Sequence, residues 1–472
     1  ADGGIKNYPA DAAWFADVHQ FSANHAAIAS VVSTATGKDV PAIISRIGDV
    51  SLTGYIGGEH NKLAANVRVS TSLGNIRAAV DKCKNSITGH IETVDFNVGK
   101  LADDNKLGHL SANINIHGQS EDNMSAIGRV YNFDYNGYKY RDINLDASYR
   151  LKVVEGRVEI DDPNAQISAS GQLNIASETP LLKANVSVGR FAPNSLHLTQ
   201  KWQSTAFAAN ISCDINGSSV NDADGTVEIR DFSMLSPKSE YGLRNVTVRT
   251  GFDGDNHFLN LNSDFGQVNI NGHFNYNTIA RSVLNMVAAK LPTIPGLTRQ
   301  PQKEVNDFTI NASISNTDWM KYLLGIPLEI YSPLNISGEL NDKHEKIDLW
   351  CDVPSFAYDG NRFSDSFVNI ESPNDTLKAD IRIKKLADKG KYMSLQLSAG
   401  ASDNHLNTSL SFGNNERHPL KGVINASTVF AKNIDGVSTA YVDVLPSRAT
   451  IGDTTWHVAP STIVYSKNHL EV

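Results

Sequence analysis

Some residues of this chain could do chemistry if their spacing allowed it. The sequence contains no serine elbow of the form G-x-S-x-G, no phosphate loop ending in G-K-[ST], no H-E-x-x-H helix and no C-x-x-C pair. Thr36-Gly37-Lys38 resembles the end of a phosphate loop, but the upstream glycine is missing and Asp39 replaces Ser or Thr. We therefore interpret these residues as the end of a helix.

Several short clusters of acidic residues lack the arrangement of a metal site. Asp222–Gly225 and Asp253–Asp255 resemble parts of a calcium loop, but both lack its twelfth-position glutamate and fit hairpin turns. Asp103-Asp104 and Asp161-Asp162 also fit turns, and adjacent strand residues point to opposite faces. The 14 histidines are scattered. The sequence predicts no enzyme activity, no metal site and no cofactor.

The charge, the apolar runs and the cysteines of the chain argue against three further features: nucleic-acid binding, a membrane helix and a disulfide framework. The chain has 472 residues and a formal net charge of −9, and its basic residues cluster no further than a pair such as Lys384-Lys385. This argues against nucleic-acid binding. No apolar run approaches the ~20 residues of a membrane helix. Cys213 and Cys351 fall in phase with apolar neighbours, so we expect small apolar side chains on a buried face rather than disulfides with Cys83.

One short pattern recurs along the chain: apolar, any, apolar, any, glycine. A step of two between apolar residues predicts a strand with one dry and one wet face, and the glycine falls on the dry face. Strand glycines mark bends or close backbone approach. A sheet that bends repeatedly toward its apolar face forms a trough. The six copies are VSLTG, INIHG, ISASG, CDING, VNING and LNISG, which end at Gly54, Gly118, Gly171, Gly217, Gly272 and Gly338.

A second motif supports a modular β structure. Gly89–Phe96 and Gly225–Phe232 share a first glycine, a β-branched third residue and a final Asp-Phe. We interpret each as a strand that turns at the aspartate and places its phenylalanine under the sheet.

The beginning of the chain has a different pattern. Trp14, Val18 and Phe21 recur at helical intervals within an alanine-rich stretch. We predict that residues 1–48 form a mainly helical segment that caps the groove or is inserted in it. The chain opens at Ala1 without a signal-like segment and stops in an expected strand, so we expect it to be part of a longer protein.

From residue 49 to 472 we predict a continuous repetitive β-groove, interrupted by helical segments near 278–291 and 318–325. The predicted fold class is all-β: an elongated, twisted, U-shaped antiparallel groove. An open trough leaves its apolar side uncovered, and exposed apolar surface on that scale needs a ligand. Lipid tails are the expected ligand. The candidate lining residues share the dry phase, although each also fits ordinary sheet core under a covering element: Ile114, Ile116, Ile167, Leu173, Ile211, Ile215, Val268, Ile270, Phe308, Ile310, Ile336, Leu349, Ile381 and Ile383.

Four segments resemble a known family. They are Thr36–Val50, Asn306–Trp319, Leu334–Asp342 and Ser372–Leu377. In these segments the chain resembles the TamB proteins of the AsmA-like superfamily, in particular those of the Bacteroidetes type. The resemblance is repeat-like and extends over nearly the whole chain.

This resemblance implies a protein of the Gram-negative periplasm that is anchored in the inner membrane and spans to the outer membrane as a β-groove. It implies phospholipid acyl chains as cargo and an outer-membrane barrel of the TamA type as partner in envelope assembly. The membrane anchor and the segment that would contact the barrel are not in this sequence. The resemblance carries over no catalytic residue.

Two other classes fit the β-rich pattern less well. A secreted or surface adhesin, or a polysaccharide-binding β-solenoid, would show tighter repeats and exposed aromatic rows, whereas Trp202, Trp319, Trp350 and Trp456 are dispersed. An outer-membrane barrel would show aromatic girdles at both strand ends, and no such periodicity occurs here.

Overall fold

The computed structural model describes residues 1–6, 13–28, 30, 46–120, 122–466 and 469–471. Its 31 strands form one antiparallel sheet. Within the described residues, the first strand, β1 (Asp2–Lys6), pairs only with β2, and the last, β31 (His469–Glu471), pairs only with β30, so the sheet is open. The predicted all-β antiparallel class is confirmed.

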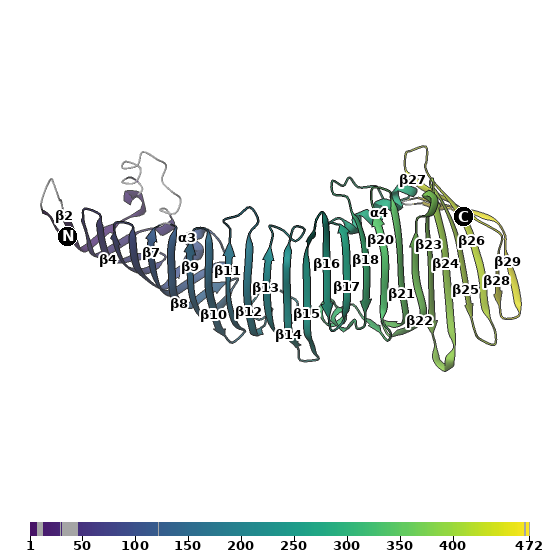
Figure 1. Cartoon of the computed structure of the whole chain (residues 1–472), viewed down its shortest axis with the longest axis horizontal. Coiled ribbons are helices and arrows are strands. Elements are labelled where there is room, and N and C mark those ends of the chain that lie inside the picture. Colours follow the sequence, from purple (N-terminus) through teal and green to yellow (C-terminus); the bar gives the residue numbers. More distant parts are fainter. Residues whose placement is uncertain (7–12, 29, 31–45, 121, 467–468, 472) are drawn as a thin grey trace. The chain divides into compact units, whose positions relative to one another are not determined.

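The sheet divides into two compact units. Unit 1 comprises residues 1–218 and 227–242, and unit 2 comprises residues 219–226 and 243–472. Figure 1 shows long antiparallel strands in each of them.

Unit 1 is a meander in which each strand from β1 to β13 pairs with the next along the chain. A short helix, α3 (Val98–Ala102), lies between two of its strands. The strands are β2 (Ala13–Ala23), β3 (Val50–Glu59), β4 (Lys62–Thr71), β5 (Gly74–Cys83), β6 (Ser86–Asn97), β7 (Leu107–Ser120), β8 (Asn123–Tyr135), β9 (Tyr138–Arg150), β10 (Val153–Asp162), β11 (Ala165–Asn174), β12 (Leu181–Phe191), β13 (Ala206–Asn216) and most of β14 (Asp224–Leu235).

Unit 2 continues this pattern with helical interruptions. Its strands are β15 (Glu240–Asp253), β16 (Asn256–Ser263), β17 (Gly266–His273), β18 (Asp307–Ile314), β19 (Leu328–Ile330), β20 (Leu334–Asn341), β21 (Lys346–Tyr358), β22 (Asn361–Glu371), β23 (Leu377–Leu386), β24 (Tyr392–Ser402), β25 (His405–Asn414), β26 (Leu420–Lys432), β27 (Ser438–Val444), β28 (Ser447–Ile451), β29 (Thr454–Val458), β30 (Ser461–Ser466) and β31. Near the C-terminal end of unit 2, strand β26 pairs with both β27 and β28, so the sheet forks at β26.

Both predicted helical interruptions are confirmed. The first is α4 (Ile279–Lys290), and the second is the single-turn η1 (Met320–Leu324). The proline-rich stretch 292–301 between α4 and β18 has no regular secondary structure.

The predicted helical segment at the start of the chain is wrong for residues 2–6 and 13–23, which are the strands β1 and β2, whereas the described residues 25–28, 30 and 46–47 are helical. In β2 a bulge between Val18 and Phe21 shifts the register against β3, so that Val18 faces Gly54 and Phe21 faces Leu52. The bulge brings residues three apart onto one face and so imitates helical spacing. The predicted helix end at Thr36–Lys38 lies outside the described residues.

The Asp-Phe motifs do bend their strands. Asp95 and Asp231 have φ angles of 50° and 51°, in the left-handed region that short polar side chains tolerate. At Asp95 the register of β6 against β7 shifts by a bulge, and Phe96 beyond it is buried. Each strand continues past its aspartate, so the predicted turn is a kink within the strand, and Phe96 is buried as predicted whereas Phe232 is only half-buried.

The pattern glycines lie where strands approach each other closely. A Cβ at Gly338 would lie 2.2 Å from the carbonyl oxygen of Asp348 on the neighbouring strand. At Gly272, φ is +131° and a Cβ would lie 2.3 Å from the carbonyl oxygen of Asp307. Neither position accepts a side chain without moving the paired strand, which confirms the predicted close approach.

Candidate functional site

Unit 1 carries one face on which apolar side chains follow each other from strand to strand. Alternation points every second residue to the same face, and antiparallel pairing sets opposite residues side by side. From β6 to β13 the register aligns one residue of each strand in a line, which we call the aliphatic row. The aliphatic row consists of Ile91, Ile114, Gly128, Leu145, Val158, Ala169, Val186 and Ile211.

Beside it runs a line of small residues, the small-residue row: Ala126, Ala147, Gly156, Gly171 and Ala184. A third line, the outer row, follows on its far side: Met124, Tyr149, Val154, Leu173, Leu182 and Ile215. Larger side chains therefore flank a line of glycine and alanine on both sides. We call this line of small residues, together with the two rows beside it, the furrow; it runs across the strands.

The side chains beside this furrow are open to solvent. Val154, Val158, Leu173 and Leu182 are between 37% and 41% exposed. They come from three adjoining strands and lie on one face. A contiguous exposed apolar surface of this kind is typical of a binding site.

The structure brings all six candidate residues of unit 1 onto this face. Ile114 and Ile211 belong to the aliphatic row, and Leu173 and Ile215 belong to the outer row. Ile116 lies opposite Ala126, in line with the small-residue row. Ile167 lies opposite Ile160, in a fourth apolar line on the other side of the aliphatic row.

Unit 2 has an equivalent apolar face. One line crosses it from β15 to β26: Val248, Leu261, Val268, Ala312, Ile336, Cys351, Val368, Ile381, Leu397, Leu410 and Ile424. The other five candidate residues of unit 2 share this face: Ile270, Phe308, Ile310, Leu349 and Ile383.

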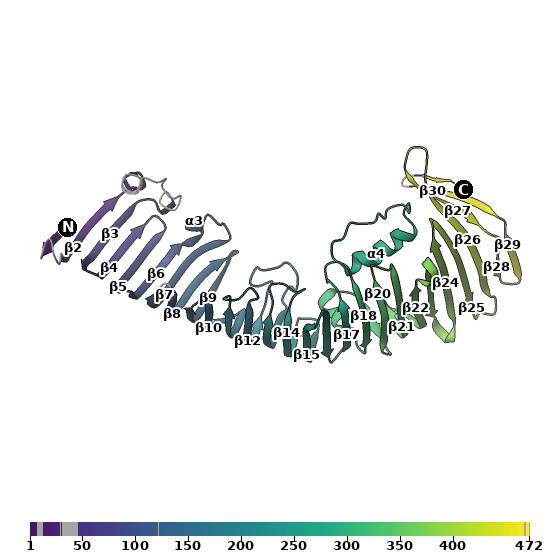
Figure 2. The same ribbon diagram turned by 45° about the horizontal axis from the view of Figure 1, so that its top comes forward.

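Part of that face is covered by the protein itself. Figure 2 shows α4 beside β18 and β20. Met286 of α4 is buried in a cluster with Ile270, Phe308, Leu340 and Ile347 of the sheet. The assignment of Ile270 and Phe308 to an open groove is therefore wrong, since both are core residues under α4 and are at most 8% exposed. Val268, Ile310 and Leu349 also pack against this cluster.

A buried hydrogen-bond network fixes α4 to the sheet, and its centre is Asn306, which is fully buried. The Asn306 side-chain amide donates to the hydroxyls of Ser282 (2.7 Å) and Thr278 (3.0 Å), and its carbonyl accepts the backbone N–H of Asn275 (2.8 Å). The carboxylate of Asp342 accepts from the Asn306 backbone N–H (2.8 Å) and from Ser282 (2.7 Å). Every hydrogen-bonding group of the Asn306 side chain is thus used.

The C-terminal end of α4 is held by charge. The ammonium of Lys290 is buried and pairs with the carboxylates of Asp375 and Glu345. Burial by itself lowers the pKa of Lys290, but the hydrogen bond and charge of Asp375, together with Glu345, outweigh it and raise that pKa. Lys290 therefore stays charged and ties the helix to two loops of unit 2.

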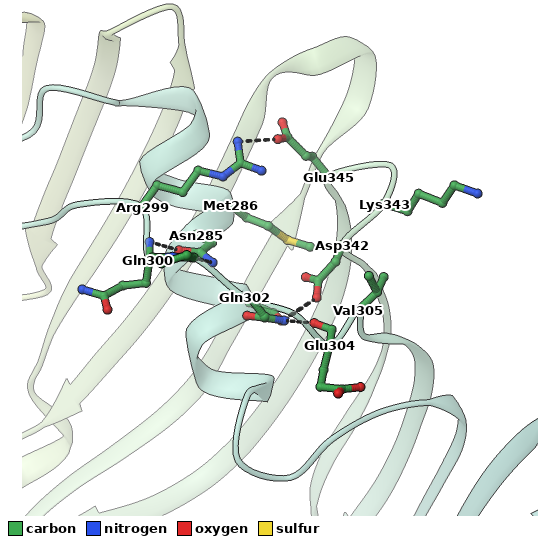
Figure 3. A pocket seen from close by; sticks show the side chains of 12 residues that line it. Asn285, Met286, Arg299, Gln300, Gln302, Glu304, Val305, Asp342, Lys343 and Glu345 are labelled. Atoms are coloured by element: carbon green, nitrogen blue, oxygen red, sulfur yellow. Dashed lines mark hydrogen bonds and ion pairs between the residues drawn. The ribbon is translucent and has the colours of Figure 1, made fainter.

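A cavity of about 520 Å³ lies next to this network (Figure 3). Its lining includes an ion pair between Arg299 and Glu345 (3.0 Å), and the amide of Gln302 donates to Asp342 (2.9 Å). Its one hydroxyl, that of Ser282, donates to Asp342, and no histidine or cysteine lines the cavity. This arrangement positions α4 and has no activated nucleophile.

His257 is a buried ionisable group in unit 2. Its ring stacks on Phe252 and Phe274, with centroids 4.7 and 4.2 Å away, and its Nε2 lies 2.8 Å from the hydroxyl of Thr250. Burial lowers the pKa of His257, with a smaller lowering from His273, against a backbone hydrogen bond at Phe274 that raises it. The folded protein therefore holds this imidazole neutral.

We expect acid to destabilise unit 2 through His257. Below pH ~6.5 the unfolded chain binds a proton that the folded imidazole does not, so stability is lost as the pH falls from there toward the lowered folded pKa. Urea unfolding at pH 7.5, 6 and 5 measures this. The His257→Phe variant should lose less stability over that range than the wild type, and equal losses would contradict the assignment.

The two strand cysteines behave as apolar residues. Cys213 lies opposite Ala184 and Cys351 opposite Ile336, so both point to the apolar face as predicted. Burial, followed by the adjacent aspartates, raises the pKa of both thiols. Neither is activated as a nucleophile.

Within the described part of the chain, no group of three or more His, Cys, Asp or Glu side chains could hold a metal ion. No described helix has the length and apolarity needed to cross a membrane. No protein-family model, curated protein or solved structure matches this chain.

Proposed function

We propose that the apolar face of unit 1 binds the acyl chains of phospholipids. The observation that carries this proposal is the furrow of the small-residue row, flanked by aliphatic side chains of which Val154, Val158, Leu173 and Leu182 are more than a third exposed. Each methylene buried there contributes about 0.8 kcal/mol. Two partly buried tails therefore outweigh any single polar contact.

The mechanism is passive binding without catalysis. Three adjoining lines of the face are built almost entirely from aliphatic side chains, glycine and alanine, so neighbouring positions along the furrow offer an acyl chain similar contacts. A lipid can then move along it without breaking specific hydrogen bonds. Head groups stay in water beyond the apolar rows.

The resemblance to TamB proteins supports a wider form of this proposal. In that form the chain is the periplasmic segment of a bridge-like lipid conduit between the inner and outer membranes of a Gram-negative bacterium. It supports assembly of the cell envelope together with a TamA-type barrel, and an inner-membrane anchor lies outside this sequence.

Lipid capture tests the proposal. The chain is produced in a bacterial periplasm, purified without detergent, and analysed by native mass spectrometry and lipid extraction. We expect phospholipid on the wild type and its loss from a double variant with Val158→Asp and Leu173→Asp. Ile127→Asp is the matched control, because Ile127 is 54% exposed on the opposite face of β8.

The control variant should keep its lipid. A lipid-free wild type, or equal lipid on the double variant and the wild type, would reject the acyl-chain site. Circular dichroism of each variant verifies that the strands remain folded.

A further inference from the structure

The face of unit 1 opposite the furrow is hollowed. Three hollows of about 270, 480 and 570 Å³ lie on it, and their lining residues come from strands β7 to β14. Neighbouring hollows share lining residues: Asp146 and Arg157 belong to two of them, and Ser170 and Asn185 link the next pair. The three therefore form one continuous polar channel across the strands.

The register repeats polar groups along this channel. Two lines cross it, each with one residue per strand, so that successive members lie ~4.8 Å apart. The first is Asn113, Arg129, Asn144, Glu159, Ser168, Ser187 and Asn210, and the second is Asn115, Ile127, Asp146, Arg157, Ser170, Asn185 and Ser212.

Each basic side chain that lines these hollows is paired with a carboxylate, whereas Asp146 and Glu155 form no ion pair among the described residues. Ion pairs join Arg157 to Glu159 (3.1 Å), Arg129 to Asp142 (2.5 Å) and Lys183 to Asp214 (3.1 Å). A polyanion needs unpaired basic side chains, which this channel does not offer. An acyl chain needs an apolar surface, which lies on the opposite face.

Uncharged hydrogen-bonding side chains make up most of the remaining residues in the two polar lines of the channel. Among the described residues, the side chains of Asn144, Ser168, Ser170 and Asn185 have no hydrogen-bond partner. Each amide offers two donors and an acceptor oxygen, and each hydroxyl offers one donor and two lone pairs. Tyr131, 45% exposed at the end of the channel, adds an aromatic ring on which a sugar can stack.

We propose that this polar channel binds a neutral polysaccharide strand lying across β7–β13. A chain of uncharged sugars presents hydroxyls at a regular repeat, which matches the amides and hydroxyls that recur with the strand spacing. This function is separate from acyl-chain binding, because it uses the other face of the same strands.

Affinity electrophoresis of the full chain tests this proposal. Native gels contain hydroxyethylcellulose, laminarin or glycogen as neutral probes, and heparin as a charged probe. We expect at least one neutral polysaccharide to retard the wild type and heparin not to. A double variant, Ser170→Ala with Asn185→Ala, should bind about tenfold more weakly, because it loses two hydrogen-bonding side chains.

The variant with Val158→Asp and Leu173→Asp should keep the retardation, so a failed lipid site and a failed polysaccharide site are distinguishable. No retardation by any neutral probe would overturn the proposal. So would stronger retardation by heparin, or equal retardation of the Ser170→Ala, Asn185→Ala variant and the wild type.

Discussion

Replacing Asn306 by alanine is expected to release α4 from the sheet and to lower the free energy of unfolding of unit 2 by about 3–5 kcal/mol. The substitution removes an amide that donates to Ser282 and Thr278 and accepts the backbone N–H of Asn275. Each buried group left without a partner costs about 1–3 kcal/mol. No water reaches these groups easily, because Asn306 is fully buried.

Urea unfolding and hydrogen–deuterium exchange measure this effect. The amides of α4 should exchange faster in the variant, while those of β7–β12 in unit 1 keep their rates. Asn311→Ala is the matched control, since Asn311 is exposed on β18 and should change stability by less than about 0.5 kcal/mol. Unchanged protection of α4 in the Asn306 variant would show that apolar packing alone holds the helix.

The second large effect is expected at a strand glycine. Gly338→Ala should destabilise unit 2 by about 2–4 kcal/mol, because its Cβ would lie 2.2 Å from the carbonyl oxygen of Asp348. The two strands must separate to admit the methyl group. That separation weakens the pairing of Gly338 with Leu349 and of its neighbours along β20 and β21.

Gly400→Ala provides a control of the same chemistry. Gly400 lies in β24, also a strand of unit 2, and a Cβ there would meet nothing within 4 Å. We expect this variant to match or slightly exceed the stability of the wild type, since alanine loses less backbone entropy than glycine on folding. Equal destabilisation of both variants in urea unfolding would contradict the role assigned to close strand approach.

The apolar faces of the two units differ in their exposure to solvent, because α4 covers only part of the face of unit 2. Beneath α4, Ile270 and Phe308 are core residues. In unit 1 the residues flanking the furrow stay partly exposed. A substitution such as Ile270→Asp would therefore unfold the protein rather than test ligand binding, whereas Val158→Asp leaves the core intact.

Much of the fold follows from local pattern. The step-of-two alternation predicted the strands and the dry phase of residues such as Ile114 and Ile336, and both helical interruptions were also predicted from the sequence. The alternation succeeded because a strand with one wet face records its orientation in every second residue. It failed at β2, where a bulge gives Trp14, Val18 and Phe21 the spacing of a helix.

For the candidate sites, too, the sequence predicted one property and the tertiary structure was needed for another. Sequence alone determined which side chains point to the apolar face, because side-chain direction depends on position within one strand. Only the tertiary structure decided which of them stay open, because burial of Ile270 depends on α4 folding back over strands from both sides of it in the sequence. The polar channel likewise emerged only when the register brought Asn, Ser and Arg side chains of seven strands into line. Pairing between strands is a long-range property that no single segment contains.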